Sequence, residues 1–225
     1  MIQKPNFWSR AFVITTWIGA CVYFQTLAQP TKKDAKAFAI LEAVNQKYKS
    51  FTSFQADFTY KLYSPTSKVN ETVAGNITVK GKKYALKLEK QEIRTDGKTI
   101  WTYLKDANEV TIADYEKDDD EITPENIFEI YKKGFKYIYT GETKEGGVVY
   151  DNIELAPEDR NKKFTKIKIK IDQAQKTIKS WEIYMRNADR YSYVVNNFVS
   201  NPIVNDNIFI MNKSQFPKAE WNDLR

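Results

Sequence analysis

The stretch Phe54-Gln55-Ala56-Asp57-Phe58-Thr59-Tyr60-Lys61-Leu62 alternates apolar and polar residues without a break. A β-strand turns successive side chains to opposite faces of its sheet, so this period of two predicts a half-buried strand. The alternation returns in Val73–Val79 and in Tyr84–Leu88, and the dipeptide Asp96-Gly97 between two further short strands is typical of a tight hairpin turn. The sequence therefore predicts a series of antiparallel strands joined by turns.

Further strands are predicted after this opening series, and turns rather than crossover helices join most of them. They cover residues 110–112, 135–140, 148–155, 164–171, 178–185 and 191–198. Many short strands joined by turns favour one antiparallel sheet that curls on itself over a parallel α/β fold. The predicted fold class is therefore mainly β with helical additions (α+β).

An amphipathic helix is predicted just before the first strand. Asp34 is a suitable N-cap, and an apolar stripe follows it at spacings of four, three and four residues. The residues of this stripe are Ala37, Leu41, Val44 and Tyr48. Such a stripe predicts a helix that packs one face against the sheet.

A second, shorter helix is predicted in the middle of the chain. Thr123 is a suitable N-cap, Pro124 takes the first helical position, and Gly134 ends the helix. Its apolar side chains are Ile127, Phe128, Ile130 and Tyr131. So high an apolar content in so short a helix predicts that it is buried against the sheet.

The composition removes most catalytic classes. The 225 residues include no His, which removes the usual general base and the commonest metal ligand. The acidic run Asp118–Glu121 lacks the ligand spacing and the Gly of a calcium loop, so we interpret it as a solvated loop. The pattern pairs no two carboxylates across a cleft. We therefore expect no enzyme, no catalytic residues, no metal and no cofactor.

The positive charge is spread along the chain. The formal net charge is +6, and Lys166–Ile171 alternates Lys with Ile, which places three lysines on one solvated face of a strand. A nucleic-acid site needs basic residues clustered with stacking aromatics on one surface. We therefore expect no nucleic-acid partner.

The N-terminus has the pattern of a secretory signal peptide. Lys4 and Arg10 precede an uncharged, mostly apolar run of 14 residues, 11–24, and the small residue Ala28 marks a cleavage site. We expect residues 1–29 to be a cleaved signal peptide and residues 30–225 to form a single β-domain. A competing interpretation is that the stretch ending in Cys21 is a lipobox, in which case Cys21 would be lipidated. With one Cys, the chain forms no intramolecular disulfide.

The aromatic content leaves two interpretations of the sheet's inner face open. The chain has 5 Trp, 14 Tyr and 13 Phe, and a sheet face this rich in apolar side chains must be buried. Either the two helices close an ordinary core, or they fail to fill the concave side and leave a cavity for an apolar ligand.

Several stretches together resemble the periplasmic outer-membrane lipoprotein carriers, the LolA-like proteins. The most specific is Thr95-Asp96-Gly97-Lys98-Thr99-Ile100-Trp101-Thr102-Tyr103. Shorter matches in the same order are Phe54–Phe58, Gly75–Lys80, Ile153–Pro157, Ile178–Trp181 and Asn207–Phe209. The likeness extends over almost all of residues 30–225.

The resemblance implies an unclosed antiparallel β-barrel of about ten or eleven strands with a helical lid over an apolar cavity. It implies a periplasmic chaperone that ferries acylated lipoproteins from the inner to the outer membrane. The implied partners are the cargo lipoproteins, an inner-membrane lipoprotein-releasing ABC transporter as donor, and an outer-membrane acceptor. We expect a monomer. Alternatives are an envelope lipid- or lipoprotein-sensing protein and, if Cys21 is lipidated, a membrane-anchored acceptor.

The strand phase and the resemblance together define a hypothetical site. The predicted cavity wall comprises Phe58, Tyr60, Leu62, Ile77, Val79, Tyr84, Leu86, Leu88, Trp101, Tyr103, Ile169 and Trp181, and the predicted lid comprises Leu41, Ile127, Phe128 and Tyr131. A one-residue slip in a strand would exchange its two faces. The chain departs from the family where Val79-Lys80 is followed by Gly81, since the carriers have a lid-latching Arg there. We assign no latch residue from the sequence.

Overall fold

The computed structural model describes residues 32–116, 122, 126–132 and 134–225. Within these residues twelve strands form a single sheet. The strands are β1 (Phe54–Ser64), β2 (Val69–Lys80), β3 (Lys83–Leu88), β4 (Gln91–Thr95), β5 (Thr99–Leu104), β6 (Glu109–Asp114), β7 (Phe135–Glu145), β8 (Val148–Pro157), β9 (Phe164–Asp172), β10 (Thr177–Met185), β11 (Arg190–Ser200) and β12 (Glu220–Asp223).

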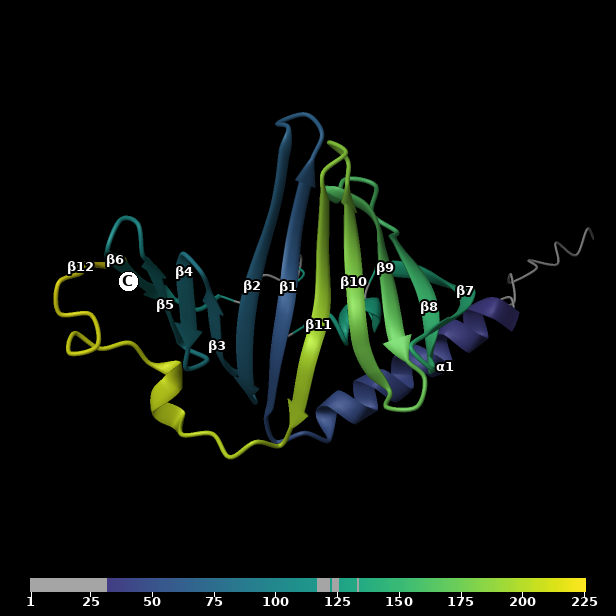
Figure 1. Cartoon of the computed structure of the whole chain (residues 1–225), viewed down its shortest axis with the longest axis horizontal. Helices are drawn as coiled ribbons and strands as arrows, with labels where there is room; N and C mark the ends of the chain where they lie inside the picture. Colours follow the sequence, from purple (N-terminus) through teal and green to yellow (C-terminus); the bar gives the residue numbers. More distant parts are fainter. Residues whose placement is uncertain (1–31, 117–121, 123–125, 133) are drawn as a thin grey trace, which may run out of the picture.

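The sheet is open and curled, with β12 and β7 at its two edges (Figure 1). Its order is β12-β6-β5-β4-β3-β2-β1-β11-β10-β9-β8-β7. The neighbours pair antiparallel except β12 and β6, which run parallel. The predicted unclosed antiparallel sheet is therefore confirmed. The short β12 and its parallel pairing were not predicted.

The first helix, α1 (Lys32–Lys49), packs on the inner face of the sheet against β7 and β10. Its whole predicted stripe is buried: Ala37, Leu41, Val44 and Tyr48. The helix begins two residues before Asp34, so the expected N-cap lies inside it. Lys47 and Lys49 end it, where positive charge suits the helix dipole.

The second predicted helix is replaced, in the residues that the structure describes, by a turn at 126–129 and the 3-10 helix η1 (Ile130–Lys132). Its backbone bonds span three residues, from Glu129 N to the carbonyl of Asn126 (2.9 Å) and from Lys132 N to that of Glu129 (3.2 Å). A run this short favours such tight turns over a regular α-helix. We call residues 126–132 the lid segment.

Some expectations fall on residues outside the described ranges. These are the leader 1–29 with Cys21, the acidic run 118–121, and the helix start at Thr123 and Pro124.

Strand β1, near the middle of the sheet, pairs with a strand that is distant in the sequence. β1 pairs with β2 on one side and with β11 on the other, where Phe54 lies opposite Ser200. After β11 the chain crosses back as a C-terminal arm (residues 201–225), drawn in yellow in Figure 1. The arm includes the 3-10 helix η2 (Asp206–Phe209) and ends in β12.

Side chains fasten this arm to the outer face of the sheet. Asp206 accepts hydrogen bonds from Lys80 and Lys83, each at 2.7 Å, and these bonds lower the pKa of Asp206 to about 2. Phe209 is completely buried. Arg94 donates to the carbonyl of Ile210 at 2.8 Å. The arm is therefore a packed part of the fold.

Gly75 allows close packing across the inner face, and we expect Gly75→Val to destabilise the protein. A Cβ atom at Gly75 would lie 2.5 Å from Cζ of Phe58 and 2.7 Å from Cδ2 of Leu88. Because both of these side chains must then shift, we expect a loss of about 1–3 kcal/mol in the free energy of unfolding, measured by urea titration. Ala74→Val, at an exposed neighbouring position, should change it little. Equal stability of the two variants would contradict the expected clash.

Candidate functional site

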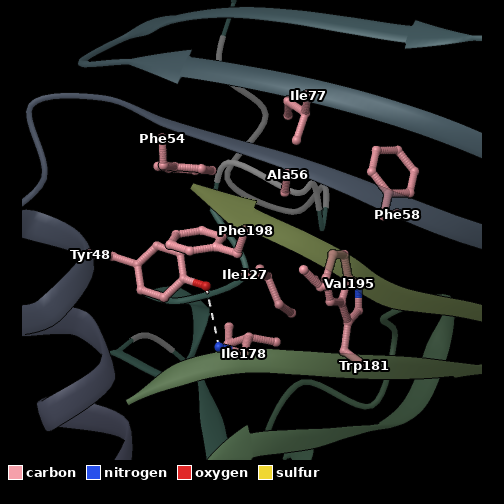
Figure 2. Close-up of a pocket in the computed structure, with 10 residues that line it drawn as sticks. All are labelled: Tyr48, Phe54, Ala56, Phe58, Ile77, Ile127, Ile178, Trp181, Val195 and Phe198. Carbon is pink, nitrogen blue, oxygen red and sulfur yellow. Dashed lines mark hydrogen bonds between the residues drawn. The ribbon is translucent and has the colours of Figure 1, made fainter. Parts of the chain in front are cut away.

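The main hydrophobic core lies between the sheet, α1 and the lid segment, and it leaves a small cavity at its centre. Figure 2 shows the side chains that converge on this cavity from α1, the lid segment and strands β1, β2, β10 and β11. They are Tyr48, Phe54, Ala56, Phe58, Ile77, Ile127, Ile178, Trp181, Val195 and Phe198. The cavity measures about 20 Å³. It has room for about one water molecule, so the interior is nearly filled.

Tyr48 closes one end of the cavity. Its ring stacks on Phe128 of the lid segment, with 4.8 Å between centroids and 15° between planes. Its hydroxyl oxygen accepts a hydrogen bond from the backbone N–H of Ile178 at 3.2 Å (dashed in Figure 2). Burial raises the pKa of Tyr48 to about 12, so the phenol stays neutral at physiological pH.

A hydrogen bond fastens the lid segment to α1. The Tyr131 hydroxyl donates to Oε2 of Glu42 at 2.6 Å, and Tyr131 is only 3% exposed. Oε1 of Glu42 accepts from Nε2 of Gln46, also at 2.6 Å. The bonds from Tyr131 and Gln46 lower the pKa of Glu42. We call the Tyr131–Glu42 bond the latch.

A wider hollow, the mouth pocket, opens beside the cavity. It measures about 250 Å³ and is lined by Tyr48, Lys49, Phe51, Thr52, Ser53, Phe54, Val79, Gly81, Phe128 and Glu129. Tyr48 and Phe54 line both spaces. On the lid segment, Ile127 lines the cavity and its neighbour Phe128 lines the mouth pocket. The lid segment therefore touches both spaces.

The structure brings thirteen of the sixteen predicted site residues into the main core. Those buried there are Phe58, Ile77, Val79, Tyr84, Ile169, Trp181, Leu41, Ile127 and Tyr131. Those partly buried against it are Tyr60, Leu86, Leu88 and Phe128. The members of this set that line the cavity or the mouth pocket are Phe58, Ile77, Val79, Trp181, Ile127 and Phe128.

The prediction placed Trp101 and Tyr103 on the wrong face. Directly paired residues share a face, and Trp101 lies opposite Arg94, whereas the inward Tyr84 pairs with Thr95. Trp101 and Tyr103 instead belong to a second cluster with Val110 and Met211, packed against Phe216, Ala219 and Trp221. The C-terminal arm covers them there, so both faces of β5 carry apolar residues.

Leu62 lies in neither cluster and is half-buried. It pairs with Glu71 in the β1–β2 hairpin, whose far end projects above the rest of the sheet (Figure 1). The strand phase of Leu62 points inward as predicted, but the strand runs past the core at this point.

A strictly alternating pattern cannot predict that Val195 and Phe198 both line the cavity, because they lie three residues apart on β11. A β-bulge changes the register between β1 and β11, since Asp57 pairs with Asn197 but Phe58 pairs with Val195. The extra residue moves the inward phase of β11 from odd to even positions. Tyr48 belongs to the predicted apolar stripe of the helix, and Phe54 and Ala56 belong to the apolar face of the first predicted strand. The sequence therefore did carry a signal for these three residues.

Gly81, the position at which the resemblance implies a latching Arg, lies in the β2–β3 turn with φ of +61°. The preceding Lys80 donates to the carbonyl of Val204 (3.4 Å) as well as to Asp206, so it holds the C-terminal arm. In this chain the lid segment is fastened by the latch from α1 instead.

The described part of the chain has few features of other site types. Within it, no group of three or more His, Cys, Asp or Glu residues is placed to hold a metal ion. Nor does any described helix have the length and apolarity needed to cross a membrane.

An open, curled antiparallel sheet with an aromatic and aliphatic inner face under a helix and a short lid defines the class of unclosed β-barrels that bind lipids or lipoproteins. The chain belongs to one family of that class. The family described as outer membrane lipoprotein carrier protein LolA matches residues 49–212.

A solved structure supports the same fold. An uncharacterised conserved protein from Thermus thermophilus is 12% identical, with a TM-score of 0.57 over 84% of this chain and 99% of that one. Lipoprotein LppX from Mycobacterium tuberculosis is 12% identical, with a TM-score of 0.49 over 76% and 98% of the two chains. A LolA superfamily protein from Nitrosomonas europaea is 12% identical, with a TM-score of 0.42 over 78% and 97%. No curated protein matches the chain significantly.

Proposed function

We propose that this protein is a periplasmic carrier that binds the acyl chains of lipoproteins beneath the lid segment and ferries them from the inner to the outer membrane. The observation that carries the proposal is an apolar core cavity covered by a segment held through side chains, in a chain of this family. Transfer of one acyl chain of about fifteen methylenes from an apolar environment into water costs about 12 kcal/mol, at roughly 0.8 kcal/mol for each methylene. Such cargo needs an escort.

In this structure the lid segment is closed over the cavity. A cavity of about 20 Å³ is far smaller than the roughly 150 Å³ that holds a benzene molecule, so an acyl chain cannot enter as the side chains stand. If the lid segment swings outward, Ile127 leaves the cavity and Phe128 leaves the mouth pocket, so both spaces lose part of their wall and become larger. Cargo then takes the place of lid side chains.

Such an exchange suits a carrier that must also release its cargo. The closed lid buries Ile127 and Phe128 against the same surface that the acyl chain would cover, so part of the binding free energy is offset by lid displacement. Direction then comes from differences in affinity between the donor, the carrier and the acceptor. We propose an inner-membrane lipoprotein-releasing ABC transporter as donor and an outer-membrane acceptor, with no chemical step on the cargo.

Lipoprotein release from spheroplasts tests the proposal. Purified protein is added to spheroplasts that contain the donor transporter and are labelling new lipoproteins. We expect labelled lipoproteins to leave the inner membrane in a soluble complex with the protein. If the folded protein leaves them in the membrane and also binds no acylated peptide in solution, the proposed carrier function is wrong.

A further inference from the structure

The connector between β11 and η2 carries a fully exposed isoleucine on a fixed backbone. Ile203 is 105% exposed. Beside it, Asn201 N donates to the carbonyl of Ser53 and Ser53 Oγ donates to the carbonyl of Pro202, each at 2.8 Å. Thr52 N donates to Oδ1 of Asn201 at 2.8 Å. The connector is thereby tied to the loop that lines the mouth pocket.

This connector forms the lower boundary of the molecule in Figure 1, next to the end of α1. Val199, four residues before Ile203, is also exposed, at 42%. A lone exposed apolar side chain is common on loops, so a second, independent feature is needed to point to a partner.

That second feature is the positive charge around the mouth pocket. Exposed lysines come from the end of α1, from the β2–β3 turn and from the lid segment: Lys47, Lys49, Lys82 and Lys132. Lys132 lies beside Lys49, and partial desolvation together with this neighbouring charge lowers the pKa of Lys132.

The nearby carboxylates offset only part of this charge. Asp206 forms ion pairs with Lys80 and Lys83, and Glu129 is half-buried in the wall of the mouth pocket. Glu42, which also acts on Lys132, accepts hydrogen bonds from Tyr131 and Gln46. A surface that combines exposed apolar side chains with several lysines has the two kinds of contact that hold a protein on an anionic bilayer.

We propose that the mouth face, formed by Lys47, Lys49, Lys82, Lys132 and Ile203, docks on the surface of a bilayer that contains anionic lipids. The lysines meet the negative headgroups, and Ile203 enters the boundary between headgroups and acyl chains. Docking presents the mouth pocket to the lipid, so acyl chains pass between membrane and protein with little exposure to water. This last use of the docked state rests on the proposed function; the docking itself does not.

Co-sedimentation with vesicles tests the docking. We expect the protein to bind vesicles of phosphatidylcholine mixed with phosphatidylglycerol, to bind pure phosphatidylcholine vesicles much more weakly, and to dissociate as salt is raised. Ile203→Glu should lower binding roughly tenfold, because it removes one buried apolar side chain and adds a charge of the wrong sign. Leu224→Glu is the matched control, since Leu224 is 70% exposed but lies at the β12 edge.

Equal binding by the Ile203→Glu and Leu224→Glu variants, or no preference for anionic vesicles, would overturn the docking proposal. Binding of an acylated peptide in solution is measured on the same proteins to separate the two proposals. Normal peptide binding with no vesicle docking overturns this inference and leaves the carrier function standing. Vesicle docking with no peptide binding supports this inference and contradicts the carrier function.

Discussion

Replacement of Ile127 by glutamate is expected to lower the affinity for acylated peptides by about 100-fold or more. Ile127 is 3% exposed and lines the cavity from the lid segment. In the proposed complex the lid segment, displaced from the cavity, closes on the hydrocarbon that has replaced it, so the side chain at position 127 contacts the cargo and is shielded from water. An ionised carboxylate there loses its hydration without gaining a partner, which costs several kcal/mol, and about 1.4 kcal/mol corresponds to each factor of ten.

The measurement is a titration with a fluorescent diacylated peptide. Ile138→Glu makes the same chemical change on the outer face of β7, where Ile138 is 41% exposed, and should bind as the unchanged protein does. Thermal unfolding of both variants checks that the sheet is intact. The described backbone hydrogen bonds of the lid segment join residues within that segment, so we expect the sheet to stay folded in the Ile127→Glu variant. Full binding by a folded Ile127→Glu variant would place the acyl chains elsewhere.

Tyr131→Phe is expected to open the lid roughly tenfold more often, because it removes the latch and keeps the ring. A hydrogen bond to a charged acceptor is stronger than one between neutral groups, and its loss leaves Glu42 with one partner fewer. Faster amide hydrogen exchange in residues 126–132 reports the opening. If opening precedes cargo entry, affinity for the acylated peptide rises by up to the same factor.

Tyr137→Phe is the control for this variant, since Tyr137 packs against Tyr131 with 6.4 Å between ring centroids.

The latch also predicts a pH dependence. The pKa of Glu42 is lowered by the bonds from Tyr131 and Gln46, so the closed lid is fully stabilised above the ordinary carboxyl pKa of 4.5. That contribution is lost as pH falls through the lowered pKa. Tyr131→Phe should weaken this acid-induced opening, and an unchanged profile would contradict the latch.

The strands and the first helix could be predicted because their signals are local. The period of two in Phe54–Leu62 and the stripe from Ala37 to Tyr48 both reflect one buried face, and the structure buries those faces. The same reasoning found most of the inner wall, since residues such as Ile77 and Ile169 alternate with polar neighbours in the sequence.

The errors arise where distant chain segments decide the outcome. In β5 both Ile100 and Trp101 are apolar, and the choice of face depends on the C-terminal arm, which buries Trp101 from more than a hundred residues away. The bulge opposite Asp57 and Phe58 likewise depends on pairing between β1 and β11. The latch joins Glu42 to Tyr131 across 89 residues, and the residues next to either one in the sequence do not indicate this hydrogen bond.

The position of β1 also governs how the molecule can assemble. Strands β1 to β6 are consecutive neighbours, and so are β7 to β11, but the two groups meet only where β1 pairs with β11. Each group can form from contacts close in sequence. The seam between β1 and β11 joins distant residues, such as Phe54 and Ser200, which lie 146 positions apart, and it can form only after β11 has been synthesised. Until then, two long unpaired strand edges are available to other chains. The nascent protein is thus most prone to aggregate just before its last long strand is in place.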